Sequence, residues 1–256
     1  MEHASKILLI EDSESFVKLM SIKIQKRGYA LEVAGSKAEA EQLLAQDAQR
    51  FFITIVDMQL PDALDGEMVD YTLSKGIPSV VFAGTFDAEM RAQMWRKKVV
   101  DYVIKDSPAS VAYVVDLCER LDRNRSTKVL VVDDSKSARY LLSTLLKIHN
   151  FQVFQAVDGE QALAVYQEHP DIRLILTDYN MPNLDGFGLI KKLRAKISRR
   201  TLAIIGVTAS NDPVLSAKFI KFGANDYLKK PFSAEEFYCR IHLNIEMVEQ
   251  TEVGSM

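Results

Sequence analysis

The octapeptide Lys128-Val-Leu-Val-Val-Asp-Asp-Ser135 joins a continuous run of apolar β-formers to two carboxylates. A strand without polar alternation is typical of a parallel sheet that helices cover on both faces. A closely similar octapeptide, Lys6-Ile-Leu-Leu-Ile-Glu-Asp-Ser13, precedes it, so that Asp134 lies 122 residues after Asp12. A period of this length indicates a duplicated domain rather than a solenoid of short repeats.

Two further segments recur at nearly the same spacing. Ile55-Val-Asp-Met-Gln-Leu-Pro61 corresponds to Leu176-Thr-Asp-Tyr-Asn-Met-Pro182, and Asp101-Tyr-Val-Ile-Lys105 corresponds to Asp226-Tyr-Leu-Lys-Lys230. The segment between the copies is polar and has no apolar periodicity, which is typical of a linker. We therefore predict a first domain over residues 1–122, a linker over 123–127, a second domain over 128–248 and a tail over 249–256.

Short strands rich in Ile, Val and Leu alternate with segments of helical periodicity in each copy. In the second copy, strands are predicted at Lys128–Val132, Gln152–Ala156, Leu174–Thr177, Ala203–Val207 and Asp226–Leu228. Such alternation favours a parallel sheet with right-handed crossovers. The predicted fold class is therefore α/β, with two (βα)₅ doubly wound domains in tandem, each with the strand order 2-1-3-4-5.

Polar side chains stand where the strands of the second copy end. Asp133 and Asp134 follow the first strand, Asp178 follows the third, Thr208 the fourth and Lys230 the fifth. The carboxyl ends of the strands in such a sheet border one crevice at the topological switch point. We therefore expect three carboxylates, a hydroxyl and an ammonium group to lie close together.

This set of groups suits phosphoryl transfer to a carboxylate. Clustered carboxylates repel one another and favour a bound cation, and hard oxygen ligands in a wet site are typical of Mg²⁺. Asp178 could then act as a nucleophile that forms an acyl phosphate. The metal and Lys230 would neutralise the phosphoryl oxygens, and Thr208 is placed to donate a hydrogen bond to one of them.

On these residues each copy resembles a receiver domain of two-component response regulators, the CheY-like family with a flavodoxin-like fold. The most specific signatures are Asp178-Tyr-Asn-Met-Pro-Asn-Leu-Asp-Gly186 and Lys230-Pro-Phe232. The resemblance covers nearly the whole chain. It implies a phosphorelay function, in which Asp178 takes a phosphoryl group from a sensor histidine kinase or a histidine phosphotransfer protein.

The resemblance also implies roles for the neighbouring residues. Mg²⁺ would be held by Asp134, Asp178 and the backbone carbonyl of Asn180, with Asp133 in support. Thr208 and Tyr227 would form the conformational switch, and Lys230 would contact the phosphoryl group. The Lys230–Pro231 peptide bond is expected to be cis. The surface that reports phosphorylation would be formed by the last two helices and the last strand.

The first copy keeps most of this set. Its counterparts are the phosphoacceptor Asp57, the metal-binding residues Glu11, Asp12 and Gln59 (through its backbone carbonyl), and the contact and switch residues Lys105 and Tyr102. Two departures affect the switch: Ala83 stands where Thr or Ser is expected, and Asp106 follows Lys105 in place of proline. The third helix or its loops are also about one turn shorter.

Two interpretations of the first copy stay open. Asp57 accepts phosphate with weak coupling to the output face, or the copy is a pseudo-receiver that serves dimerisation or docking. For the whole chain, the leading hypothesis is a phosphoacceptor response regulator that acts by contact with a downstream protein target or by self-association. The alternative is the receiver–receiver half of a longer regulator, such as a diguanylate cyclase.

Neither hypothesis makes the chain an enzyme beyond Mg²⁺-dependent self-phosphorylation and autodephosphorylation at Asp. A phosphatase of the haloacid dehalogenase type is disfavoured, because Gln59 and Asn180 stand where that class has a second aspartate. A dinucleotide-dependent dehydrogenase is disfavoured because no Gly-x-Gly-x-x-Gly follows the first strand of either copy.

Composition bounds the remaining expectations. The chain has 48% hydrophobic residues, two cysteines and a net charge of −3. Two cysteines are too few for a disulfide framework, and no apolar run approaches the roughly 18 residues that cross a bilayer. The charge does not resemble that of a nucleic-acid-binding domain. We expect a cytoplasmic protein that contacts neither nucleic acid nor membrane.

Overall fold

The computed structural model describes residues 6–63, 66–85, 87–209 and 213–253. The chain divides into two compact units, which are treated separately below. Unit 1 contains Met1–Arg125 together with Ile148–Asn150, and unit 2 contains Ser126–Lys147 together with Phe151–Met256. No helix in the described part of the chain is long and apolar enough to cross a membrane.

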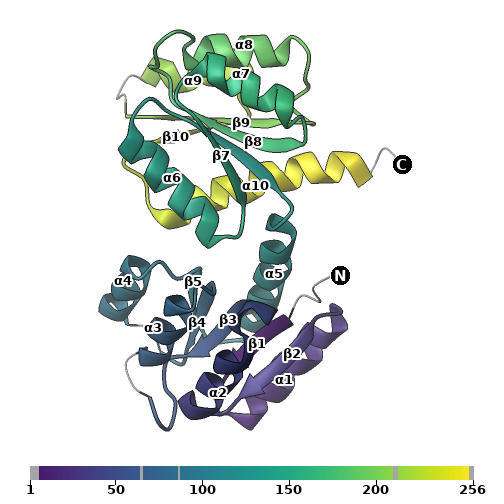
Figure 1. Cartoon of the computed structure of the whole chain (residues 1–256), viewed down its shortest axis with the longest axis vertical. Helices are drawn as coiled ribbons and strands as arrows, with labels where there is room; N and C mark the ends of the chain where they lie inside the picture. The colour runs from purple at the N-terminus through teal and green to yellow at the C-terminus, as the bar shows by residue number, and fades with distance from the viewer. Residues whose placement is uncertain (1–5, 64–65, 86, 210–212, 254–256) are drawn as a thin grey trace. The chain divides into compact units, whose positions relative to one another are not determined.

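Unit 1 is a parallel five-stranded sheet with helices on both faces (Figure 1). The strand order is β2-β1-β3-β4-β5, and every neighbouring pair is parallel. Its elements are β1 (Lys6–Ile10), α1 (Glu14–Lys26), β2 (Ala30–Ala34), α2 (Lys37–Asp47), η1 (Ala48–Arg50), β3 (Phe51–Asp57), α3 (Glu67–Ser74), β4 (Ser79–Ala83), α4 (Ala88–Arg96), β5 (Asp101–Ile104) and α5 (Pro108–Asn124).

Unit 2 repeats this topology with the sheet order β7-β6-β8-β9-β10, again all parallel. Its elements are β6 (Lys128–Val132), α6 (Lys136–Ile148), β7 (Gln152–Ala156), α7 (Gly159–Glu168), β8 (Ile172–Thr177), α8 (Gly186–Arg194), β9 (Ala203–Thr208), α9 (Pro213–Phe222), β10 (Asp226–Lys229) and α10 (Ala234–Val253). Read in chain order, both sheets have the order 2-1-3-4-5, which confirms the predicted fold class.

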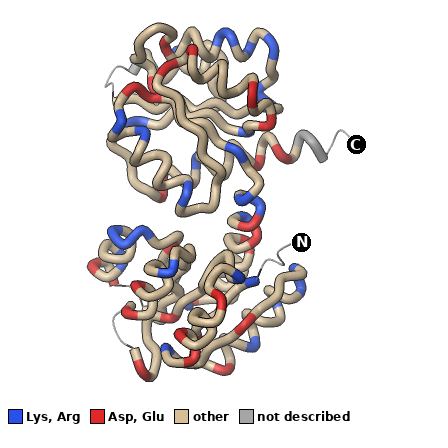
Figure 2. Tube along the Cα trace, viewed as in Figure 1, with Lys and Arg blue, Asp and Glu red and all other residues tan. Residues whose placement is uncertain are grey.

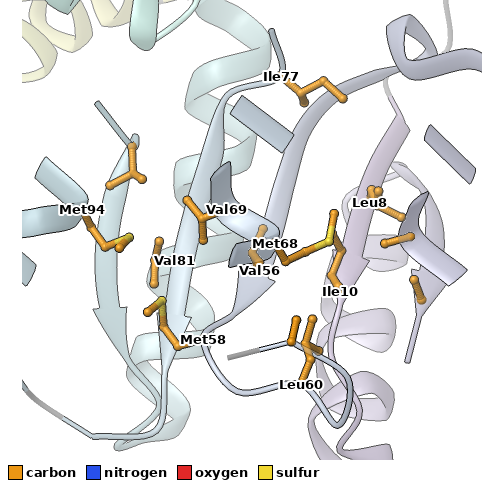
Figure 3. Packing of buried hydrophobic residues seen from close by; sticks show 14 of the residues in the cluster. Leu8, Ile10, Val56, Met58, Leu60, Met68, Val69, Ile77, Val81 and Met94 are labelled. Atoms are coloured by element: carbon orange, nitrogen blue, oxygen red, sulfur yellow. The ribbon is translucent and has the colours of Figure 1, made fainter. Parts of the chain in front are cut away.

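The central strands β1, β3 and β4 of unit 1 are buried on both faces of the sheet, which explains their apolar sequences. Ile10, Val56 and Val81 pack with Met68 of α3 and Met94 of α4 in one cluster (Figure 3). The alternate residues of the same strands pack against α1 and α5 in a second cluster. Full burial of such a side chain contributes about 1.5–3 kcal/mol to the free energy of folding. The two clusters therefore fix the positions of the strands and of the residues at their carboxyl ends.

Two predicted boundaries fall inside helices. Helix α5 continues to Asn124, so residues 123–124 of the predicted linker are helical, and α10 continues to Val253 into the predicted tail. Ion pairs between Arg123 and Glu119 and between Arg125 and Asp122 stabilise the end of α5. Pairs three or four residues apart support the exposed side of this turn, while Leu121 and Asn124 are buried on its other side. The domain boundaries at 122 and 248 themselves stay predictions.

The length difference between the copies lies in one loop. Four residues, 75–78, connect α3 to β4 in unit 1, whereas eight residues, 195–202, connect α8 to β9 in unit 2. Helices α3 and α8 both end eight residues after the equivalent glycines Gly66 and Gly186. The shorter spacing in the first copy therefore comes from the loop after the third helix and not from the helix itself.

Candidate functional site

An acidic cluster lies at the carboxyl ends of β1 and β3 in unit 1. Glu11, Asp12 and Asp57 each offer a carboxylate oxygen, and these oxygens all lie within 4.8 Å of one another. The two strands are direct neighbours in the sheet, so their ends bring the side chains together. Glu11 and Asp57 are buried, whereas Asp12 is exposed. The structure thus unites the three carboxylates that the sequence predicts for this copy.

Lys105 closes the cluster of unit 1 from the end of β5. Its Nζ lies 2.5 Å from Oε2 of Glu11 and 2.7 Å from Oδ2 of Asp57, and its side chain is only 6% exposed. The same Nζ lies 5.0 Å from the ring centroid of Phe16 and 5.5 Å from that of Phe82. Two carboxylates and two aromatic faces together offset the cost of burying the ammonium group.

Burial also perturbs the acid beside Lys105. Desolvation raises the pKa of Glu11, and the negative charge of Asp57 raises it further. The hydrogen bond and the charge of Lys105 act in the opposite direction, but they do not cancel the effect of burial. A second positive charge at this site would therefore stabilise the ionised form of Glu11 and lower its pKa.

In unit 2 the corresponding groups are arranged more openly. Lys230 Nζ lies 2.7 Å from Oδ2 of Asp133 but 3.7 Å from Oδ1 of Asp178, and its side chain is 23% exposed. Asp134 is exposed at the start of the connection to α6. Within the described residues of unit 2, no three carboxylates approach one another as closely as those of unit 1. Desolvation raises the pKa of Asp178, with a contribution from the charge of Asp133.

Both candidate acceptor carboxylates are oriented in the same way. The backbone N–H of Gln59 donates to Oδ1 of Asp57 over 3.2 Å, and that of Asn180 donates to Oδ2 of Asp178 over 3.2 Å. In each case the other carboxylate oxygen is the one that faces the lysine. One oxygen is thereby held by the chain while the other points into the crevice.

Comparison with known proteins agrees with this geometry. The family model of the response regulator receiver domain matches residues 129–242. The protein described as "Probable chemotaxis protein CheY" of Rhizobium etli is 38% identical over 115 residues, which are 44% of this chain and 88% of that protein. The chain belongs to the response regulator receiver family. It is a two-component signalling protein, and its units are a first and a second CheY-like receiver.

A solved structure and a second curated relative are also similar to this chain. A crystal structure of a two-component system response regulator/GGDEF domain protein is similar over 96% of this chain and 99% of that chain, with 37% identity and a TM-score of 0.86. The protein described as "Probable transcriptional regulator ycf27" of Porphyridium aerugineum is 39% identical over 124 residues, which are 48% of this chain and 50% of that protein. The chain thus spans about half the length of the ycf27 proteins that it matches.

The switch position differs between the receivers as the spacing predicts. The carbonyl of Thr208 accepts a hydrogen bond from the N–H of Lys230, and the carbonyl of Ala83 accepts one from the N–H of Lys105, both over 2.8 Å. Ala83 is therefore the structural counterpart of Thr208. A cavity of about 180 Å³ borders Ala83 and is also lined by Thr85 and Tyr102. The first receiver has open space where the second has a hydroxyl group.

The two tyrosines near the switch are also placed differently. Tyr102 is buried, and its hydroxyl donates to the carbonyl of Thr85 over 3.3 Å. Tyr227 is half-buried and packs against Phe219, with 5.8 Å between ring centroids. Burial raises the pKa of both phenols, so both stay protonated at neutral pH. The Lys230–Pro231 bond is cis, as the resemblance implied.

Two residues of the second receiver support the site, although no role was predicted for either of them. Arg139 of α6 donates through Nη1 to the backbone carbonyls of Asp133, over 2.6 Å, and Asp134, over 3.0 Å. Gly186 packs against the backbone of Asp178 so closely that no side chain fits there. The duplication could not point to Arg139, because the equivalent position of the first copy is Val17. Gly186 did leave a signal, since Leu184-Asp-Gly186 repeats Leu64-Asp-Gly66.

Replacement of Arg139 by glutamine is expected to weaken Mg²⁺ binding by the second receiver about tenfold. Its guanidinium holds the backbone that carries Asp133 and Asp134, the predicted metal ligands, and loss of a residue that supports metal ligands commonly costs 10–100-fold in affinity. Calorimetric titration of Mg²⁺ in an Asp57→Asn background measures the change. Lys136→Gln removes the same charge from the same helix and should leave the affinity near its starting value. Equal affinities for the two variants would refute the role of Arg139.

Proposed function

We propose that this chain is a phosphoacceptor response regulator of a phosphorelay, with Asp178 as the principal acceptor. The observation that carries the proposal is the arrangement around Asp178, which combines a carboxylate oriented by the N–H of Asn180 with the facing ammonium group of Lys230. The partially exposed side chain of Asp178 leaves the carboxylate accessible to a phosphodonor.

The transfer needs little covalent chemistry from the protein. A carboxylate oxygen of Asp178 attacks the phosphorus of a phosphohistidine, the P–N bond breaks, and the imidazole leaves with its electron pair and takes a proton from water. Lys230 balances the charge on the phosphoryl oxygens, and Thr208 donates to one of them. Hydrolysis of the acyl phosphate by water restores the carboxylate, so the chain needs no other enzymatic activity for signalling.

The carboxylate donors suit Mg²⁺. In the first receiver the oxygens of Glu11, Asp12 and Asp57 lie within 4.8 Å of one another, and hard oxygen donors of this kind are the ligands that Mg²⁺ prefers. Bound Mg²⁺ would supply further neutralisation of phosphoryl charge. The residues that would hold it are Glu11, Asp12, Asp57 and the carbonyl of Gln59 in the first receiver, and Asp133, Asp134, Asp178 and the carbonyl of Asn180 in the second.

Asp57 is proposed as a second acceptor. Its orientation by Gln59 and its contact with Lys105 match or exceed those of the second receiver. What the first receiver lacks is the hydroxyl at Ala83, which belongs to the switch and not to the transfer. Phosphorylation adds about −1.5 to −2 charges, and here that charge would meet no switch hydroxyl at position 83. The competing hypothesis is a pseudo-receiver that serves dimerisation or docking.

Partners and output follow from this role. A sensor histidine kinase or a histidine phosphotransfer protein would supply the phosphoryl group, and a downstream protein or a second copy would read the result. Likeness over nearly the whole chain to a response regulator/GGDEF domain protein favours a second candidate, the regulatory half of a longer diguanylate cyclase. That the chain contacts neither nucleic acid nor membrane stays a prediction.

Intact mass after incubation with Mg²⁺ and acetyl phosphate tests the proposal. The wild-type chain should gain two phosphoryl groups, Asp178→Asn and Asp57→Asn should each gain one, and the double variant none. Asparagine keeps the shape of the side chain but removes the nucleophilic oxygen. A gain that is lost only in Asp178→Asn would make the first receiver a pseudo-receiver. No gain on any variant, with Mg²⁺ present, would refute the phosphoacceptor function.

A further inference from the structure

A groove of about 510 Å³ lies between α7 and α8 of the second receiver. Leu163, Tyr166 and Pro170 line it from α7 and the residues that follow, and Leu193 and Ile197 line it from α8 and its loop. Helix α8 begins at Gly186, directly after the acceptor loop (residues 178–185, which begins with Asp178), whereas the groove adjoins the last turns of the helix. The groove is therefore separate from the phosphorylation site.

One wall of the groove is a loop that the first receiver lacks. The eight-residue connection 195–202 carries Ile197, and the first receiver has only the four residues 75–78 at this place. The side chain of Arg194 holds the loop in position. Its guanidinium donates to the carbonyls of Ile197, Ser198, Leu202 and Gly223 and to the side chain of Asn225, over 2.7 to 3.4 Å. Three of these hydrogen bonds reach the loop itself and two anchor Arg194 to the segment between α9 and β10, so the wall is a preformed feature of the surface.

The rim of the groove is basic. Lys192 and Lys196 line it, and Lys191 and Arg200 lie close by in the sequence. Figure 2 shows Lys and Arg along α8. Within the described part of the chain these four cations make no ion pair, and the stretch from 187 to 200 contains no Asp or Glu. Mutual repulsion among unpaired cations favours an anionic partner.

The corresponding helix of the first receiver has the opposite character. Helix α3 carries Glu67 and Asp70, and both are already paired, with Lys37 and Lys97 respectively. An apolar floor with an unpaired basic rim therefore occurs at the second receiver and not at the described residues of its duplicate. Because both copies share the fold, the difference is not a requirement of the fold itself.

We propose that this groove binds an acidic amphipathic helix of a partner protein. Apolar side chains at helical spacing would enter between Tyr166 and Ile197, while carboxylates on the flanks of the same helix would meet Lys192 and Lys196. Helices α7 and α8 pack against each other, and the groove between them can accept a third helix, which is a common mode of peptide recognition. The inference is independent of phosphoryl transfer and adds a docking surface to the receiver.

The inference is tested by selecting peptides that bind the full chain from a displayed library of random sequences. The selected peptides then serve as the probes. Recovered peptides should combine Asp or Glu with apolar residues three and four positions apart. Their affinity should fall at least tenfold on the chain that carries Lys192→Glu and Lys196→Glu, because two attractions become repulsions. A chain with Lys218→Glu and Lys221→Glu on α9 has the same net charge and should bind as the wild type does. Both pairs of lysines are exposed, so folding is unaffected.

Other outcomes overturn the proposal. Peptides without acidic–apolar character, or peptides that bind the Lys192→Glu, Lys196→Glu chain as tightly as wild type, would show that the groove is not such a site. Self-association of the wild-type chain that is lost in that variant alone would assign the groove to a second copy of this protein instead. Ile197→Ser, which removes the apolar wall and keeps the rim, should also weaken the selected peptides.

Discussion

Replacement of Gly186 by alanine is expected to slow phosphorylation of Asp178 at least tenfold and to destabilise the second receiver by about 1–3 kcal/mol. A Cβ at position 186 would lie 2.3 Å from the carbonyl oxygen of Asp178 and 3.2 Å from Cα of Tyr179. Both contacts are with backbone, so no side-chain rotation relieves them. The N–H of Gly186 also donates to the carbonyl of Tyr179 over 3.0 Å, which ties helix α8 to the acceptor loop.

The clash must therefore displace either the start of α8 or the acceptor itself. A shift of about 1 Å in a reacting group can cost two orders of magnitude in rate. Urea unfolding measures the loss of stability, and intact mass against time with acetyl phosphate measures the rate. Asp57→Asn in the same chain restricts the phosphorylation signal to Asp178.

Gly188→Ala is the matched control on the same helix. Its Cβ would meet Cδ1 of Leu184 at 2.5 Å, which is the far end of a flexible side chain. Alanine also improves helix propensity by about 1 kcal/mol over glycine, so the net change in stability should be small. If Gly186→Ala behaved like Gly188→Ala in both measurements, close packing against Asp178 would not control the acceptor.

Replacement of Lys105 by methionine is expected to destabilise the first receiver by about 3–5 kcal/mol when divalent metal is removed by EDTA. Methionine keeps the length of the side chain and its contacts with Phe16 and Phe82, but it leaves the carboxylates of Glu11 and Asp57 without their cation. Chemical unfolding with and without Mg²⁺ measures the effect. Mg²⁺ should restore part of the stability, because it supplies the missing positive charge between the same oxygens.

The sign of the pH dependence follows from the pKa of Glu11, which burial already raises. Without Lys105 the pKa rises further, so folding favours the protonated acid relative to the unfolded chain. A group with a raised pKa in the folded state contributes stability at low pH and loses it as pH increases. The Lys105→Met chain should therefore lose more stability at neutral than at acidic pH.

Lys230→Met is the corresponding change in the second receiver and should cost clearly less. Lys230 is 23% exposed and contacts Asp133 closely, while Asp178 lies 3.7 Å away. Water screens the carboxylates that remain, so the uncompensated charge is less severe than at Lys105. Equal stability losses in both receivers would contradict the assignment of Lys105 to a buried charge network.

Much of the fold was predictable because strand and helix patterns are local. The strand predicted at Lys128–Val132 is β6 with the same bounds, whereas β8 begins at Ile172, before the predicted Leu174. Residues 123–124 of the predicted linker are helical because ion pairs support the exposed side of the last turn of α5, while Leu121 and Asn124 are buried on its other side. Polar composition does not separate a solvated helix from a loop.

The sequence by itself determined the duplication, the order of the strands and the chemical identity of the groups at their ends. These properties depend on periodicity and residue type, which are local. Tertiary packing determined how deeply Lys105 is buried between Phe16 and Phe82, which backbone Arg139 holds, and where Ile197 forms a wall. Those contacts join residues far apart in the chain, and their distances follow from how helices pack on the sheet.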